Sequence, residues 1–427
     1  MQIEPFALER WFDRYEHDAD IMLAESGIRS LDSADFDTDP GELGYVIPTD
    51  GDPEFRATIA ERYDRTAEEV VFTCGTQEAN LLAFLSLVGE DEDDHAVVVT
   101  PTYQSLRSVP AAFGEVSTVW LDPPDWRLDA EDLKAAIRPE TEVVVVNNPN
   151  NPTGRYHAAE TIEACYEIAA DNDAYLLCDE VYRLLAADHL PPVASMGDRG
   201  ISTTSLTKAY GLAGLRFGWL CGSSEVADSA RKWKDYTTIS PSIFGQHVAR
   251  QVLDPAFDAD PAGDAGFGVD YDGSVDPDGV SKREAAILAE NRELAARNRE
   301  RVSDFIAEYS ERGLSWHEPV GVNGFLTVPD GFESGRAFCR QVVEEESIVL
   351  APGECFGVES NDIGGDGRSE TGGVGQASAA DGTRGTEGTD DGSEPDLGGY
   401  FRLGFGLPTS ELEEGLSRLG EFLDRNR

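Results

Sequence analysis

The stretch Ser205-Leu-Thr-Lys-Ala-Tyr-Gly-Leu-Ala-Gly-Leu-Arg-Phe-Gly-Trp219 gives the first indication of how this chain folds. It places Lys208 three residues after a serine and eight residues before Arg216. The segments on either side, residues 201–204 and 217–221, are apolar and β-branched and predict two strands. We therefore expect the lysine on a tight loop at a strand end, with a cation folded back beside it.

That arrangement gives the lysine a chemical role to be weighed against ordinary solvation in a loop. A neighbouring cation shifts a lysine amine toward its neutral, nucleophilic form. A hydroxyl and an arginine close by are suited to a phosphate. The combination favours a Schiff base between Lys208 and a phosphorylated aldehyde, which points to pyridoxal phosphate.

Alternating strands and helices surround this stretch. Short apolar runs predict strands over residues 70–73, 96–100, 116–121, 143–146 and 174–178. Periodic segments predict helices over residues 53–63, 78–88, 128–137 and 158–171. This order is typical of an α/β fold with a mostly parallel sheet between helices, in which ligand groups converge at the carboxyl ends of the strands.

Polar residues follow several of these strands. The turn Cys74-Gly-Thr-Gln77 opens a helix and offers free N–H groups to an anion. Tyr103, the loop 147–154 and Asp179 follow other strands. Each alone has a structural explanation, as a plain turn, a packed tyrosine or a helix cap.

The remaining segments complete the large domain and predict a smaller α+β domain made of the N-terminal segment and the C-terminal third. Helices are expected over residues 1–31, 233–253 (broken or kinked at Pro241), 281–309, 334–346 and 410–425, and strands over 314–328, 347–350 and 400–405. We divide the chain into an N-terminal segment (1–40), a large cofactor-binding domain (41–290) and a C-terminal small domain (291–427). Acidic, low-complexity insertions are expected over 254–280 and 359–398.

The amino-acid composition limits which binding partners and which cellular compartment are expected for the protein. The chain has 82 acidic and 34 basic residues and a net charge of −48, which argues against nucleic acid or anionic membranes as partners. Because the acidic residues are spread along the chain, a salt-adapted proteome explains their excess better than an acidic interaction tail does. The six cysteines show no metal-ligand spacing, and no apolar run is long enough to cross a membrane. We expect a cytoplasmic protein without a bound metal.

Four motifs in this order resemble the class I/II aminotransferases, pyridoxal-phosphate enzymes of fold type I. They are Asn151-Pro-Thr-Gly154, Asp179-Glu-Val-Tyr182, Ser205-Leu-Thr-Lys208 with Arg216, and Phe401-Arg-Leu-Gly-Phe405. The resemblance runs from about residue 44 to the C-terminus, apart from the two insertions.

The resemblance implies a role for each matching residue. Lys208 would form the Schiff base and move the substrate proton, and Asp179 would face the pyridinium nitrogen. Asn151 and Tyr182 would donate hydrogen bonds to the phenolic oxygen, and Tyr103 would stack on the ring. The phosphate would be held by Gly75, Thr76, Gln77, Ser205 and Arg216.

The substrate and subunit contacts are also implied by the resemblance. Arg402 would clamp the α-carboxylate beside Asn151, and Tyr45 would reach the phosphate of a neighbouring subunit in a homodimer. The family's N-terminal substrate loop matches loosely at Glu25-Ser-Gly-Ile-Arg29, where the resemblance offers Gly27 or Arg29 as a substrate contact. No second arginine matches one that would bind a dicarboxylate side chain.

The function implied is transfer of an amino group between an L-amino acid and a 2-oxo acid. The motifs fix the cofactor more firmly than the reaction. A lyase, racemase or cyclase on the same site stays open, as does a non-catalytic sensor that binds the cofactor, although no DNA-binding domain is visible.

Overall fold

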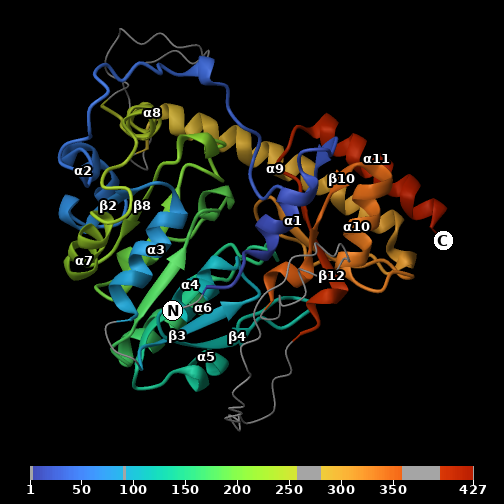
Figure 1. The fold of residues 1–427 in the computed structure, drawn as a ribbon, viewed down its shortest axis with the longest axis horizontal. Helices are drawn as coiled ribbons and strands as arrows, with labels where there is room; N and C mark the ends of the chain where they lie inside the picture. The colour runs from blue at the N-terminus through green and yellow to red at the C-terminus, as the bar shows by residue number, and fades with distance from the viewer. Residues whose placement is uncertain (1–2, 90–92, 257–279, 358–394, 427) are drawn as a thin grey trace, which may run out of the picture.

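A seven-stranded sheet forms the centre of the larger lobe in the computed structural model, which describes residues 3–89, 93–256, 280–357 and 395–426 (Figure 1). Its strand order is β2-β8-β7-β6-β5-β3-β4, and β8 runs antiparallel to both neighbours. The strands are β2 (Val70–Thr73), β3 (His95–Thr100), β4 (Glu115–Trp120), β5 (Thr141–Asn147), β6 (Tyr175–Asp179), β7 (Gly200–Ser205) and β8 (Gly218–Cys221). The predicted α/β architecture with a mostly parallel sheet is confirmed.

The apolar run in β5 shows why this sheet is covered on both faces. Val144 and Val146 belong to the hydrophobic core shared with the small lobe, whereas Val143 and Val145 belong to the core on the other face. Alternating side chains of a strand point to opposite faces, so a strand with two apolar faces needs cover on each. The helices of this lobe are α2 (Pro53–Glu61), α3 (Thr76–Leu87), α4 (Ser105–Ala111), α5 (Ala130–Ala136), α6 (Ala159–Asp171), α7 (Ser224–Lys234) and α8 (Ile243–Leu253).

The smaller lobe joins both ends of the chain. Its antiparallel sheet has the order β11-β12-β9, and β1 pairs with β10 in a separate two-stranded sheet. Its elements are α1 (Ala7–Tyr15), β1 (Ile21–Met22), β9 (Asn323–Thr327), α10 (Gly335–Glu346), β10 (Ile348–Val349), β11 (Ala351–Pro352), β12 (Tyr400–Gly404) and α11 (Thr409–Arg425). Helix α9 (Lys282–Glu308) connects the lobes and crosses the boundary placed at residue 290, which stays a prediction (Figure 1).

Two predicted helices differ from the structure. The helix expected over residues 1–31 is wrong beyond Tyr15, because Ile21 and Met22 pair with β10 instead. The helix expected over 233–253 is divided into α7 and α8 by a turn that contains Pro241. A proline has no backbone N–H to continue a helix. The predicted insertions at 254–280 and 359–398 lie almost entirely outside the described residues.

The sequence predicts neither a membrane-spanning helix nor a metal site, and both features can be looked for in the described part of the chain. There, no helix is long and apolar enough to span a membrane. Within the same residues, no group of three or more His, Cys, Asp or Glu side chains could hold a metal ion.

Candidate active site

Lys208 lies on the connection between β7 and β8, as the flanking strands predict. Its Nζ donates hydrogen bonds to Glu25 Oε1 and Ser26 Oγ, both over 3.0 Å. Burial alone would lower the pKa of the amine, but Glu25 and Tyr182 together outweigh burial, and the pKa of Lys208 is raised. The expected lowering by a neighbouring cation is therefore wrong in this structure.

The cation expected to lie beside Lys208 instead contributes to a separate cluster. Arg216 Nη2 donates to the Cys74 carbonyl over 3.3 Å, and a Cβ added to Gly75 would lie 2.8 Å from that nitrogen. Thr76 Oγ1 donates to Ser205 Oγ over 2.8 Å, which joins the turn after β2 to the turn after β7. The first N–H groups of α3, two hydroxyls and a guanidinium thus meet in one place. This donor set suits a phosphate dianion.

Asp179 ends β6 and is buried with neutral donors. Its Oδ2 accepts from Asn80 Nδ2 over 2.9 Å, and its Oδ1 accepts from the Val181 N–H over 3.2 Å. Burial raises the pKa of the Asp179 carboxyl to about 6, against the lowering effects of these hydrogen bonds and of Lys208. A cationic partner, such as a protonated pyridine nitrogen, would relieve that cost.

Arg402 lies on β12 and is buried. Its Nη1 donates to Asn151 Oδ1 over 2.8 Å, and its Nη2 donates to the Ala24 carbonyl over 2.5 Å. Among the described residues, its buried Nε has no hydrogen-bond partner. Burial lowers the pKa of the guanidinium, while charge interactions with Tyr182 and Glu25 raise it. A carboxylate ligand would supply the missing acceptor and the missing negative charge.

Two predicted cofactor contacts have partners within the protein. Gln77 is exposed, and its Oε1 accepts from Ser105 Oγ over 3.0 Å, while its backbone N–H lies in the first turn of α3, where helix N–H groups have no partner within the helix. The half-buried ring of Tyr103 lies 5.0 Å from that of Phe6, and its hydroxyl donates to Glu9 over 3.4 Å. The sequence alone did not predict that α1 reaches this side of the site.

The structure gathers most of the predicted residues into two groups, one around Lys208 and one around the turn at Gly75. The Lys208 amine interacts electrostatically with Asp179, Tyr182 and Arg402. Tyr45 is the exception, because its side chain is 71% exposed in the segment before α2. Arg29 also points elsewhere, since it forms an ion pair of 3.0 Å with Glu290 on α9.

Several supporting residues had no obvious sequence signal. The Glu78 carboxylate accepts from the Cys74 N–H over 2.5 Å and forms an ion pair of 3.3 Å with the buried Lys234. Burial would raise the pKa of Glu78, but Lys234 and two threonine hydroxyls reverse the effect and lower it. Asn80 accepts from Thr203 Oγ1 over 2.6 Å while holding Asp179. Two polar residues inside an apolar helix were the available signal.

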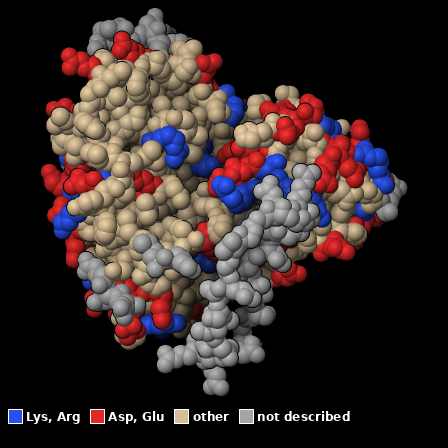
Figure 2. Space-filling view, viewed as in Figure 1, with Lys and Arg blue, Asp and Glu red and all other residues tan. Residues whose placement is uncertain are grey.

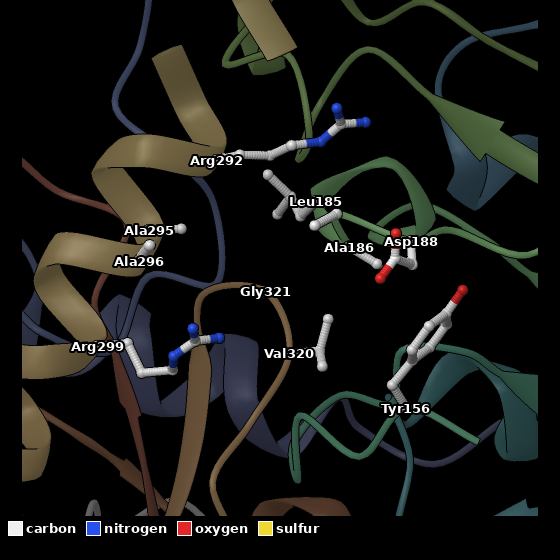
Figure 3. Close-up of a pocket in the computed structure, with 11 residues that line it drawn as sticks. Tyr156, Leu185, Ala186, Asp188, Arg292, Ala295, Ala296, Arg299, Val320 and Gly321 are labelled. Atoms are coloured by element: carbon white, nitrogen blue, oxygen red, sulfur yellow. The ribbon is translucent and has the colours of Figure 1, made fainter. Parts of the chain in front are cut away.

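The residues present therefore fit pyridoxal phosphate: a lysine amine, an anion-binding turn and a buried carboxylate that needs a cation. A different pocket, of about 320 Å³, lies between α9 and the loop that carries Val320 and Gly321 (Figure 3). There, Arg299 extends toward that loop and donates to the Pro319 carbonyl over 3.3 Å. None of the predicted site residues lines this pocket.

Comparisons with known proteins agree with this geometry. A family model described as aminotransferase class I and II matches residues 30–370. Capreomycidine synthase of Streptomyces vinaceus is 28% identical over 97% of this chain and 93% of its own length. An aspartate/prephenate aminotransferase of Thermus thermophilus is 32% identical, but the matched segment spans only 50% of this chain and 57% of that protein.

A solved structure supports the fold along the whole chain. The crystal structure of a PLP-dependent aminotransferase from Streptococcus suis matches with a TM-score of 0.78 and 26% identity. The match covers 100% of this chain and 99% of that one. The two-lobed architecture is thus that of the fold-type I enzymes.

Proposed function

Because the chain belongs to the class I and II aminotransferases, we propose that it uses pyridoxal phosphate to move an amino group between an L-amino acid and a 2-oxo acid. One observation carries the proposal. The amine of Lys208, on the loop between β7 and β8, interacts electrostatically with both the buried Asp179 carboxylate and the buried Arg402 guanidinium. Lys208 would bond to the aldehyde of the cofactor, Asp179 would pair with its ring nitrogen, and Arg402 would bind the substrate carboxylate.

Each side chain then has a defined task. When bound, the cofactor supplies an electron sink for the substrate Cα. Lys208 would hold the cofactor and later take up and return the Cα proton. Asp179 would keep the ring nitrogen protonated, and Asn151 and Tyr182 would donate to the phenolic oxygen. Arg402 would orient the α-carboxylate.

The test is a panel of L-amino acids mixed with purified protein that carries the cofactor. Production of the corresponding 2-oxo acids, together with an absorbance change of the bound cofactor, is expected. Arg402→Ala should raise the apparent dissociation constant of every amino acid and leave the absorbance of the resting enzyme unchanged. Arg402→Lys should not restore binding, because the planar fork is lost. Unaltered amino-acid affinity in Arg402→Ala would contradict the assignment.

A cyclase is the second candidate. Capreomycidine synthase matches nearly the full length of this chain, whereas the Thermus aminotransferase matches half of it. The same panel separates the two functions by their products. An aminotransferase yields a 2-oxo acid and needs an acceptor, whereas a cyclase yields a ring compound that keeps its α-nitrogen and needs none.

We also propose a homodimer with shared sites. Large apolar side chains are exposed on the segment before α2 and on the segment from the end of α7 into α8: Leu43, Tyr45, Ile47, Trp233, Tyr236, Ile239 and Phe244. Both segments lie on the side of the large lobe remote from the small lobe (Figure 1). Exposed apolar clusters of this kind are typical of protein interfaces. A partner subunit that covers them would place Tyr45 against its neighbour.

Mixed dimers test that sharing. Lys208→Ala protein and Tyr45→Phe protein are unfolded together and refolded. If Tyr45 serves the neighbouring site, half of the sites in each mixed dimer combine both defects and half combine neither. Activity should then exceed that of either parent. An activity equal to the parental average, or a monomer at working salt, would contradict sharing.

The acidity supports a salt-adapted cytoplasmic enzyme. Acidic side chains are scattered around the edge of the larger lobe and across the smaller lobe in Figure 2. Self-repulsion of a chain with a net charge of −48 is screened at high ionic strength. Melting temperature should therefore rise with salt, and a melting temperature that falls between low and molar KCl would contradict the proposal.

A further inference from the structure

The substrate side chain should meet Glu25, a residue outside the four family motifs. Its carboxylate lies 3.0 Å from Lys208 Nζ. In the proposed function, this nitrogen moves the Cα proton, so the substrate Cα must come within hydrogen-bond reach of it. Any amino acid bound for reaction then lies within a few bond lengths of Glu25.

The backbone around Glu25 is fixed on both sides. Arg402 Nη2 donates to the Ala24 carbonyl, and the Gly404 N–H donates to the Leu23 carbonyl over 2.6 Å. A Cβ added to Gly404 would lie 1.8 Å from the Glu25 carbonyl oxygen. The segment is therefore seated directly on the strand that carries Arg402.

The charges in the site leave Glu25 available to a substrate. Arg402 is assigned to the α-carboxylate, and Lys208 loses its free ammonium group once it is joined to the cofactor. The Glu25 side chain is 57% exposed, so a ligand can reach its carboxylate. The same N-terminal segment brings a second carboxylate, Glu9, to Tyr103.

We propose that Glu25 selects amino acids whose side chains end in a cation, such as a guanidinium or an ammonium group. The proposal rests on the proposed function and adds the substrate class to it. A carboxylate in this position attracts a cationic side chain and repels the second carboxylate of a dicarboxylic amino acid. Aspartate should therefore be a poor substrate, although the Thermus relative is named for aspartate.

L-Arginine and L-citrulline test the charge with little change in shape. With the cofactor-loaded enzyme, kcat/KM for L-arginine should exceed that for L-citrulline by about ten-fold or more, the usual contribution of a hydrogen bond to a charged group. Glu25→Gln should reduce that ratio to within about three-fold. The dissociation constants, followed by cofactor absorbance without an acceptor, should show the same change. The lowest salt that keeps the protein folded should be used, because screening weakens an exposed pair.

Two further variants keep the result interpretable. Glu290→Gln removes a carboxylate that pairs with Arg29 of the same segment, and it should leave the ratio unchanged. Glu25→Asp keeps the charge and should retain a preference for L-arginine. Cofactor absorbance of each variant confirms that it is folded.

Two outcomes would overturn the inference: a wild-type ratio near one, or a ratio unchanged in Glu25→Gln, which includes an equal loss for both amino acids. An equal loss would place Glu25 at the α-amino group or at Lys208 instead. If no amino acid yields a 2-oxo acid or perturbs the cofactor, the proposed function itself fails, which is a different result.

Discussion

Two regions meet at Lys208. One region comprises the turns that follow β2, β6 and β7. The other is the extended N-terminal segment over residues 20–31. The turns and the strand ends beside them hold side chains that suit the cofactor, namely Asp179 and the Thr76–Ser205 pair. The N-terminal segment instead contacts the lysine amine and the arginine assigned to the substrate. The difference suggests that the turns determine the chemistry and the segment determines which amino acid is accepted.

Removing the lysine should have the largest effect. Lys208→Ala should slow amino-group transfer by about 10²–10⁴-fold, the usual contribution of a positioned acid–base group. Single-turnover absorbance measures the loss, and exposed Lys232→Ala is the matched control. Borohydride reduction should place the cofactor label on the peptide that contains Lys208, and a label on another lysine would refute the assignment.

Breaking the ion pair between Lys234 and Glu78, which lies under the turn after β2, should have the second-largest effect. Lys234→Met leaves Glu78 buried without its cation, which typically costs about 3–5 kcal/mol of unfolding free energy. Denaturant unfolding with and without cofactor measures this loss. Lys234→Met combined with Glu78→Gln should recover part of the stability. Because the pair lies under the turn at Cys74, a changed preference among amino acids would contradict the separation of the two regions.

Replacing Asp179 should have the third-largest effect, and its effect on the free energy of unfolding should depend on pH. Its pKa is raised from 3.8 to about 6, so ionising it at pH 7 costs the cofactor-free fold about 3 kcal/mol. The wild-type protein should lose stability relative to Asp179→Asn as pH rises from about 4 to 6. The cofactor-loaded Asp179→Asn variant should be much less active than the wild type, because a neutral amide does not keep the ring nitrogen protonated as a carboxylate does. Parallel stability profiles of the two cofactor-free proteins would contradict this account.

The same two regions differ in how far sequence predicts them. The strand over 143–146 and the turn after Asp179 follow from local patterns, since an apolar run and a change to polar residues mark a buried strand and its end. Ile21 pairs with Ile348, which is 327 positions away, and no local pattern shows that partner. Helical spacing in residues 1–31 therefore predicted a helix where tertiary pairing prevails.

The site shows the same limit. The roles implied for Asn151 and Arg402 stay predictions, although the structure joins the two side chains with a hydrogen bond. The raised pKa of Lys208 could not be predicted, because it depends on a carboxylate 183 positions earlier in the chain. Sequence indicates which groups lie at strand ends, and only the packed fold shows which charges face them.

The variants with the smallest expected effects should show most clearly that the two regions control different binding constants. Ser205→Ala and Ser26→Ala each remove one hydroxyl, from the turn after β7 and from the N-terminal segment respectively. The neutral hydrogen bond between Thr76 and Ser205 should contribute about 1 kcal/mol, or roughly five-fold in a binding constant. Ser205→Ala should weaken cofactor binding by that factor and leave relative amino-acid affinities unchanged. Ser26→Ala should leave cofactor binding unchanged and alter amino-acid affinities by the same factor. Calorimetric titration of cofactor into the cofactor-free proteins, followed by amino-acid titration of the loaded ones, measures both constants. If both variants weaken the same constant, the two regions act as one site and the division between chemistry and selection fails.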